Sequence, residues 1–144
     1  MRYLGLDVGR KSIGVAVGET LASELTTIRA NGNEEFYTEP GKSRVCQELE
    51  KIIRAEEIDA IVVGLPVSEA GQPTEESKLI ETFSRDLEAK LNLTVHFVDE
   101  TLTSFMAEEM LESQGLDKKE ASERVHQLAA ELILQQYLEE YENA

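Results

Sequence analysis

An acidic residue interrupts an otherwise apolar segment near the start of the chain. Residues 3–8 read YLGLDV, and Asp7 lies at the end of this predicted strand. An unpaired charge would be costly to bury there. A metal ion, a phosphate-bound metal or a cationic side chain would offset that cost. The alternative is an aspartate that accepts hydrogen bonds from the following turn, which is common at strand ends.

Two further carboxylates, Asp99 and Glu100, directly follow a second predicted strand at residues 94–98. The carboxyl ends of strands in an α/β sheet line the ligand crevice. We therefore expect Asp7 and the Asp99-Glu100 pair to converge, which favours a functional role for Asp7. Carboxylates without a cysteine or histidine cluster favour a hard divalent cation, Mg²⁺ or Mn²⁺. Such a site suits phosphodiester hydrolysis, in which one metal activates water and a second stabilises the leaving oxygen.

Three basic residues are candidates for contact with phosphates near these carboxylates. Arg10 and Lys11 follow Asp7 in the predicted turn, and Arg124 lies in the last predicted helix. The alternative for Arg10 and Lys11 is a solvated turn with no role in binding. We assign all three to nucleic-acid binding on condition that the carboxylates form the site.

The apolar pattern predicts the order β-β-β-α-β-α-β-α-α. Strands are expected at residues 3–8, 12–18, 24–30, 58–66 and 94–98, and helices begin near residues 43, 73, 104 and 117. Strands that follow helical crossovers must run parallel to a neighbour. The pattern therefore predicts an α/β fold with a five-stranded mixed sheet, helices on both faces and residues 3–8 in the centre. The second strand should be antiparallel to its neighbours.

The second strand and the loop at residues 31–41 each have a composition that concerns the region around Asp7. The second strand has small residues on one face, including Gly14, which lets another element approach its backbone closely. The polar loop at residues 31–41 is either a mobile flap or a simple connection.

Length and composition limit the class of protein. The 144 residues fit one domain spanning residues 1–144, and the single cysteine excludes an internal disulfide. There is no signal peptide or long apolar run, so we expect a soluble cytoplasmic protein that does not enter a membrane. The net charge of −15 argues against tight, nonspecific nucleic-acid binding, although a local basic patch is compatible with it.

Four segments together resemble the YqgF family, the RuvX-type Holliday-junction resolvases and pre-16S rRNA nucleases of bacteria. They follow the family's order across nearly the full length: LDVGRKSIGVA at 6–16, IVVGLP at 61–66, VDETLTS at 98–104 and AAELIL at 129–134. The resemblance implies an RNase H-like fold, a metal-dependent nuclease and a role in maturing the 5′ end of 16S rRNA.

The resemblance also implies a set of site residues. Asp7 would be the first metal-binding carboxylate, and Glu100 or its neighbour Asp99 would be the second. The family's third acidic position falls on His126, which therefore departs from the family pattern. His126 is either a third metal ligand or a packed residue at the edge of an apolar helix face. The implied catalytic set is Asp7, Glu100 and His126, with Mg²⁺ or Mn²⁺ as cofactor.

Several functions and substrates stay open at this point. The substrate could be pre-16S rRNA or branched DNA, and a junction resolvase would require a homodimer because it acts at two symmetric sites. The chain could instead be a catalytically weakened ribosome-assembly factor that binds nucleic acid. A third alternative is an actin-like nucleotide-binding module, since Asp7-x-Gly9 followed by Lys11 resembles its first phosphate motif. That alternative requires a second domain, which 144 residues do not provide.

Overall fold

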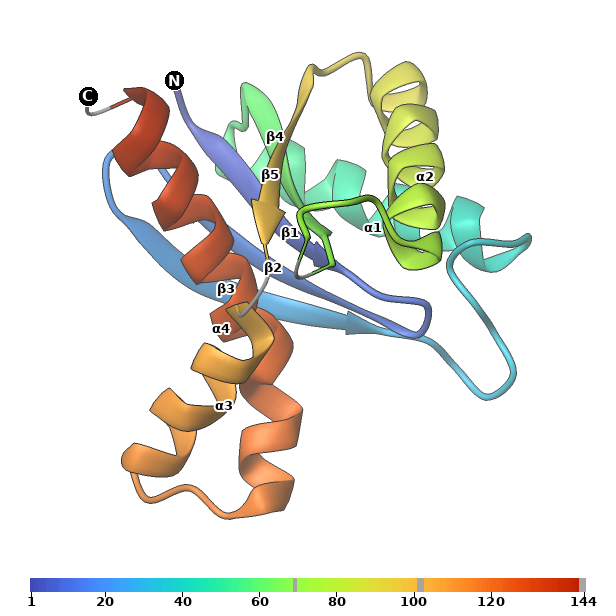
Figure 1. The fold of residues 1–144 in the computed structure, drawn as a ribbon. Coiled ribbons are helices and arrows are strands. Elements are labelled where there is room, and N and C mark those ends of the chain that lie inside the picture. The colour runs from blue at the N-terminus through green and yellow to red at the C-terminus, as the bar shows by residue number, and fades with distance from the viewer. Residues whose placement is uncertain (69, 101–102, 143–144) are drawn as a thin grey trace.

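The computed structural model describes residues 1–68, 70–100 and 103–142, and its elements follow the predicted order (Figure 1). The strands are β1 (Tyr3–Val8), β2 (Ser12–Gly18), β3 (Ala22–Arg29), β4 (Ala60–Pro66) and β5 (Val95–Glu100). The helices are α1 (Gly41–Glu56), α2 (Glu75–Leu91), α3 (Thr103–Ser113) and α4 (Lys118–Tyr137), which continues into a π-helical turn, η1 (Leu138–Glu142).

The five strands form one mixed sheet in the order β3-β2-β1-β4-β5. β1 lies in the centre, antiparallel to β2 and parallel to β4, and β2 is also antiparallel to β3. β5 is parallel to β4 at the edge. The predicted topology is therefore confirmed. Because β1, β4 and β5 run in the same direction, their carboxyl ends lie at the same end of the sheet.

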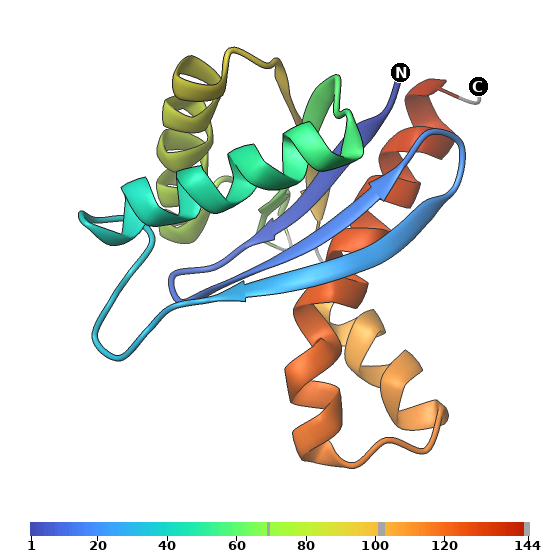
Figure 2. The same cartoon turned by 180° about the vertical axis from the view of Figure 1, so that it is seen from behind.

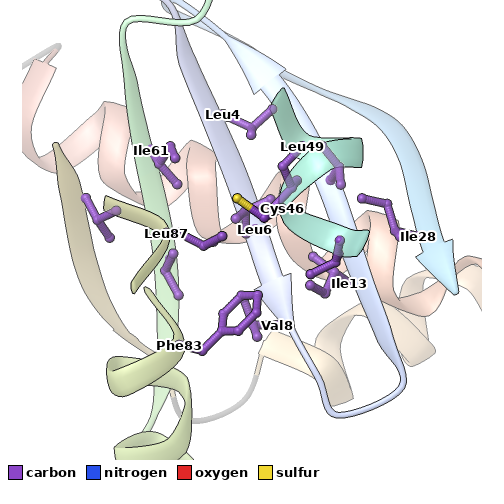
Figure 3. Packing of buried hydrophobic residues seen from close by; sticks show 14 of the residues in the cluster. Leu4, Leu6, Val8, Ile13, Ile28, Cys46, Leu49, Ile61, Phe83 and Leu87 are labelled. Carbon is purple, nitrogen blue, oxygen red and sulfur yellow. The ribbon is translucent and has the colours of Figure 1, made fainter. Parts of the chain in front are cut away.

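One face of the sheet packs against α1 and α2. Alternate residues of β1 (Leu4, Leu6 and Val8) point into this layer and are almost completely buried. They meet side chains from both helices, including Leu49 and Leu87 (Figure 3). Figure 2 shows α1 in front of the sheet on this side. This apolar layer holds the inner strands in place while their carboxyl ends carry polar groups.

The other face is covered by α4, which contacts all five strands (Figure 1). Its apolar residues, among them Ala130, Ile133 and Leu134, pack on Tyr3, Val62 and Val98. Three strand glycines allow the close approach. A Cβ atom on Gly5 would lie 2.7 Å from Cβ of Leu134, and Gly14 and Gly64 are crowded in the same way. The small-residue face predicted for β2 is thus the contact surface of a helix.

Residues at the helix ends explain where the helices begin and stop. Thr74 caps α2 in a reciprocal capping box with Ser77, and Asp117 accepts a hydrogen bond from the backbone N–H of Glu120 at the start of α4. Gly115, two residues after the end of α3, has φ +84°, a left-handed conformation that suits glycine and prevents the helix from continuing.

Helix α3 and the first part of α4 form a helical hairpin that extends beyond the sheet (Figures 1 and 2). The hairpin has its own apolar contacts, which include Ala107, Leu111, Val125 and Leu128. None of the helices in the described part of the chain combines the length and apolar character needed to cross a membrane.

Candidate functional site

Asp7 lies on the α4 face of β1, close to the carboxyl end of the strand. Its side chain is 14% exposed, and its Oδ2 atom lies 3.0 Å from Nδ1 of His126 in α4. An ionised carboxylate can only accept a hydrogen bond, so Nδ1 of His126 carries the proton in this contact. The second ring nitrogen, Nε2, then has a free lone pair whenever the imidazole is neutral. The contact therefore sets the tautomer of His126.

Gly14 brings His126 to Asp7. In the β1–β2 register Asp7 is opposite Gly14, so the two residues share a place on the same face of the sheet. A Cβ atom on Gly14 would lie 1.8 Å from the carbonyl oxygen of His126. The backbone of α4 is consequently in direct contact with Gly14, and any larger residue there would clash with it. The missing side chain at Gly14 thus allows the contact between His126 and Asp7.

Glu100 approaches the same region from the end of β5. A Cβ atom on Gly64 would lie 2.8 Å from Oε2 of Glu100, so the carboxylate lies over this glycine. β1 pairs with β4 through Leu6 and Val63, which makes Asp7 and Gly64 the next residues of two adjacent strands. Glu100 therefore reaches across Gly64 in the direction of Asp7. Its Oε2 atom is buried there.

Asp99 faces the opposite side of the sheet. It pairs with Leu65, which packs in the α1–α2 layer, whereas its neighbour Glu100 belongs to the α4 face. Asp99 is exposed. The structure thus separates two carboxylates that the sequence left as alternatives, and it brings only Glu100 to the side occupied by Asp7 and His126.

Asp7, Glu100 and His126 provide two carboxylates and one imidazole on one face. Carboxylates suit Mg²⁺ and Mn²⁺, and an imidazole adds a preference for Mn²⁺ and other transition ions. The donor set therefore has the chemistry for a divalent metal. Among the described residues, however, no three His, Cys, Asp or Glu side chains are grouped in a way that could hold an ion. What the fold assembles directly is the Asp7–His126 pair, with Glu100 over Gly64 on the same face.

Lys11 fixes the loop at residues 31–40. Its ammonium group donates hydrogen bonds to the carbonyl oxygens of Gly32 and Glu34, each at 3.1 Å. Its own carbonyl accepts a bond from the N–H of Ala30 at 2.8 Å. The loop, for which the sequence left a flap or a simple connection open, also buries Phe36 completely. It is a packed segment, and Lys11 is one of its anchors.

We expect Lys11→Met to loosen this loop without unfolding the protein. The substitution removes two exposed hydrogen bonds from a charged donor, so the free energy of unfolding should fall by about 1 kcal/mol. Amide exchange of Ala30 and Phe36 should become faster, because both N–H groups donate to the carbonyls of Arg10 and Lys11. Hydrogen exchange and urea unfolding measure these effects, with Lys78→Met on the exposed surface of α2 as the control. Equal exchange in the two variants would contradict the anchoring role.

The other two basic candidates also have acidic neighbours. Nε of Arg10 lies 3.6 Å from Oε1 of Glu35, and both side chains are substantially exposed. Arg124 lies 3.1 Å from Oε2 of Glu24 in β3. Both guanidinium groups remain partly open to solvent and can reach a phosphate only in competition with these carboxylates.

A tyrosine–glutamate pair on the α1–α2 side of the sheet was not among the candidates from the sequence. The hydroxyl of Tyr37 donates to Oε1 of Glu76 in the first turn of α2, at 3.0 Å. Burial, followed by the charge of Glu76, raises the pKa of Tyr37 above its usual range, and the charge of Asp7 adds to this effect. The sequence offers one signal: Phe36 and Tyr37 are adjacent aromatic residues in an otherwise polar loop.

Known proteins with similar sequences cover almost the whole chain. The family model described as "RuvX: Holliday junction resolvase" matches residues 1–140. A protein of Pseudomonas putida is 40% identical over 140 residues, covering 94% of this chain and 93% of its own. One of Dechloromonas aromatica is 39% identical over 139 residues, covering 94% and 89%. Both are named as candidate pre-16S rRNA nucleases.

Solved structures agree on the fold. RuvC of Thermus thermophilus in complex with a Holliday junction superposes with a TM-score of 0.61 at 15% identity, covering 95% of this chain and 92% of RuvC. The fowlpox virus Holliday junction resolvase gives 0.53 at 13% identity, covering 96% and 98%. RuvC-type resolvases have an RNase H-like fold, which confirms the predicted fold class. Together with the family match over residues 1–140, this establishes that the chain belongs to the RuvX family of Holliday junction resolvase-type nucleases.

Proposed function

We propose that this chain is a divalent-metal-dependent endonuclease of the cytoplasm that processes the 5′ end of pre-16S rRNA. Branched DNA is the second substrate class, and its symmetric cleavage would require a homodimer. The names of the relatives at 39–40% identity support RNA, and the description of the family model supports DNA junctions. The alternative of an actin-like nucleotide-binding module is the less favoured one.

The observation that carries this proposal is the convergence of Asp7, Glu100 and His126 on one face of the sheet. The three residues come from β1, β5 and α4. Asp7 contacts His126, and Glu100 lies over Gly64 on the same face, near the carboxyl ends of the parallel strands. This is where ligands bind in open α/β sheets. Gly14 lets the α4 backbone bring His126 to Asp7, and Gly64 leaves room for the Glu100 carboxylate beside Ile133.

In this proposal each residue has a separate task. Asp7 and Glu100 hold the metal, and His126 occupies the third position, with Asp99 outside the site because it faces the α1–α2 layer. Asp7 also keeps the proton of His126 on Nδ1, so Nε2 is the nitrogen available to a metal or to a proton. When bound, a divalent ion supplies Lewis-acid stabilisation of the phosphoryl oxygens and an activated water. Arg10, Lys11 and Arg124 are the cationic residues proposed for nucleic-acid contact.

Cleavage of defined substrates tests the proposal. One substrate is a labelled RNA that spans the precursor 5′ end of 16S rRNA, and the other is a four-way DNA junction. Each is incubated with the protein in Mg²⁺, in Mn²⁺ and in EDTA. We expect metal-dependent endonucleolytic products from the RNA. Absence of cleavage of both substrates in both metals would contradict the proposal.

A second candidate function is an assembly factor that binds precursor rRNA without cutting it. Two observations favour it: His126 stands at a family acidic position, and both Arg10 and Arg124 are already paired with glutamates. The same assay separates the two candidates. Saturable binding of the precursor RNA without products in either metal would support the binding factor and exclude the nuclease.

His126 should determine which metal supports cleavage. Because imidazole binds Mn²⁺ more readily than Mg²⁺, we expect the parent protein to prefer Mn²⁺. His126→Asp supplies an oxygen ligand and should raise the rate in Mg²⁺, whereas His126→Ala should lower cleavage by about tenfold or more. The ratio of initial rates in the two metals is the measurement.

His96→Ala is the matched control, because His96 contacts the ring of Tyr137 at the carboxyl end of α4, away from His126. This variant should keep the parental ratio of Mn²⁺ to Mg²⁺ rates. Parental rates for His126→Ala in both metals would make His126 a packing residue. The site would then depend on Asp7 and Glu100 alone.

A further inference from the structure

Glu35 is held beside Arg10 by the fold of the loop. The next residue, Phe36, is completely buried, and its backbone N–H donates to the carbonyl of Arg10 at 2.8 Å. On the other side, the carbonyl oxygen of Glu35 lies where a Cβ atom of Gly41 would be. The backbone of Glu35 is therefore fixed on both sides. Its carboxylate is consequently kept near the Arg10 guanidinium, with Nε and Oε1 3.6 Å apart.

Arg10 differs from the neighbouring basic residues in how firmly it is held. Lys11 donates to two backbone carbonyls and anchors the loop. Arg44 makes several hydrogen bonds to Glu34, the shortest at 2.6 Å, and one to the carbonyl of Arg29. Arg10 has one long ion pair, and its side chain is 56% exposed. Among these three cations, Arg10 is the one that an incoming group can reach without dismantling the loop.

An exposed ion pair of this kind is weak, because solvent screens it and both long side chains lose freedom. A phosphate group can bind a guanidinium through two parallel hydrogen bonds, whereas the Glu35 carboxylate reaches Arg10 through one contact at 3.6 Å. A phosphodiester can therefore displace Glu35 from Arg10. The Glu35 carboxylate reduces the gain from a phosphate contact at Arg10, which lies three residues after Asp7 in the chain.

We propose that Glu35 is a specificity-determining residue of the nuclease site, where its carboxylate competes with a substrate phosphate for Arg10. The inference rests on the proposed function, because it requires a nucleic acid as ligand. Glu35 weakens chance binding of any polyanion at the turn that follows Asp7. A substrate with enough further contacts near the site overcomes the competition, whereas a short or nonspecific strand does not.

Binding of a fluorescein-labelled RNA spanning the precursor 5′ end, followed by fluorescence anisotropy in EDTA, tests the proposal without cleavage. The variants are Glu35→Gln, Arg10→Gln and the double variant. Glu75→Gln is the control, because Glu75 is an exposed acid in the first turn of α2 and the change alters the net charge equally.

Glu35→Gln should bind the RNA about two- to fivefold more tightly, the range expected for release of one exposed ion pair. The slope of log Kd against log salt should steepen by about 0.7, because one more phosphate is neutralised on a single strand. Glu75→Gln should change both quantities less. In the Arg10→Gln background, Glu35→Gln should have no further effect, since the competing partner is absent.

The other outcomes contradict the role of Glu35 or its competition for Arg10. If the parent binds the RNA and Glu35→Gln behaves as Glu75→Gln does, Glu35 has no special role, and the proposed function is untouched. An equal effect of Glu35→Gln with and without Arg10 would likewise exclude competition at Arg10. If neither the parent nor Glu35→Gln binds RNA or the four-way junction, release of Arg10 creates no affinity and the role of Glu35 is excluded, whereas the proposed function is decided by the cleavage assay in Mg²⁺ and Mn²⁺. Unfolding in urea verifies that each variant is folded.

Discussion

Asp7→Asn is expected to lower metal-dependent cleavage by at least about 100-fold, because loss of a metal ligand should exceed the 10–100-fold typical of its supporting residues. Asparagine keeps the size and one oxygen of aspartate, but it carries no charge to hold a divalent ion. The measurement is the initial rate of cleavage of one defined RNA in Mn²⁺ and in Mg²⁺. Higher metal concentration should not restore the rate.

The fold should survive this substitution. The amide oxygen of asparagine can still accept the hydrogen bond from Nδ1 of His126, which is 3.0 Å from the present carboxylate oxygen. Removal of a mostly buried charge also removes a desolvation cost, so the free energy of unfolding should stay within about 1 kcal/mol of the parent. Urea unfolding measures this directly. A stable but inactive protein would distinguish a functional role of Asp7 from a structural one.

Asp99→Asn provides a control of the same chemistry in a nearby strand. Asp99 is exposed and faces the α1–α2 layer, so the site geometry predicts a rate close to the parental one. Cleavage at the parental rate by Asp7→Asn would overturn the site assignment. Loss of cleavage in Asp99→Asn but not in Asp7→Asn would mean that the opposite face of the sheet carries the chemistry.

The position of β1 was predictable because short-range patterns determine it. A tight turn after Val8 requires β2 to pair antiparallel with β1, and the helical crossover to β4 requires a parallel neighbour on the other side. Together these two constraints place Asp7 in the middle of the sheet. The close approach of another element at Gly14 was also predictable, since small residues on one strand face indicate a close neighbour.

The choice between Asp99 and Glu100 was not predictable in the same way. Both faces of β5 are partly buried, with Val95 on one and Val98 on the other. Hydrophobic alternation therefore does not show which carboxylate faces the site. The answer depends on where α4 lies, and three glycines on separate strands determine that. Their joint effect is a tertiary property that no local pattern contains.

The adjacent residues Arg10 and Lys11 show a similar limit. Both are basic, they occupy the same turn, and no periodicity separates them. Their roles diverge only because residues 32–35 fold back onto the turn, where Lys11 meets backbone carbonyls and Arg10 meets a carboxylate. The loop was left undecided for the same reason, since its contacts join residues that are distant in the chain.

Gly14→Ala should cause the largest loss of stability among the substitutions considered. The new Cβ atom would lie 1.8 Å from the carbonyl oxygen of His126 and 2.8 Å from the backbone nitrogen of Gln127. Both are helix backbone atoms, which cannot turn aside as a flexible side chain could. Overpacking of this kind typically costs about 1–3 kcal/mol, and we expect the upper end of that range or more. Urea unfolding gives the value.

Gly32→Ala separates this steric effect from the general cost of replacing glycine. Its added Cβ would meet no atom within 4 Å, but Gly32 has φ +55°, so alanine there is strained by about 1–2 kcal/mol. Gly14→Ala should exceed this loss, although Gly14 needs no left-handed conformation. Equal losses in the two variants would show that α4 yields easily to the new methyl group.

The functional consequence of Gly14→Ala follows from the same geometry. If α4 moves away from β2, His126 leaves Asp7, and both residues remain chemically intact. We therefore expect the folded fraction of Gly14→Ala to cleave more slowly and to lose the parental preference for Mn²⁺, as His126→Ala does. Rates are compared below the unfolding transition, per mole of folded protein. Parental rates together with reduced stability would mean that cleavage does not depend on the Asp7–His126 contact.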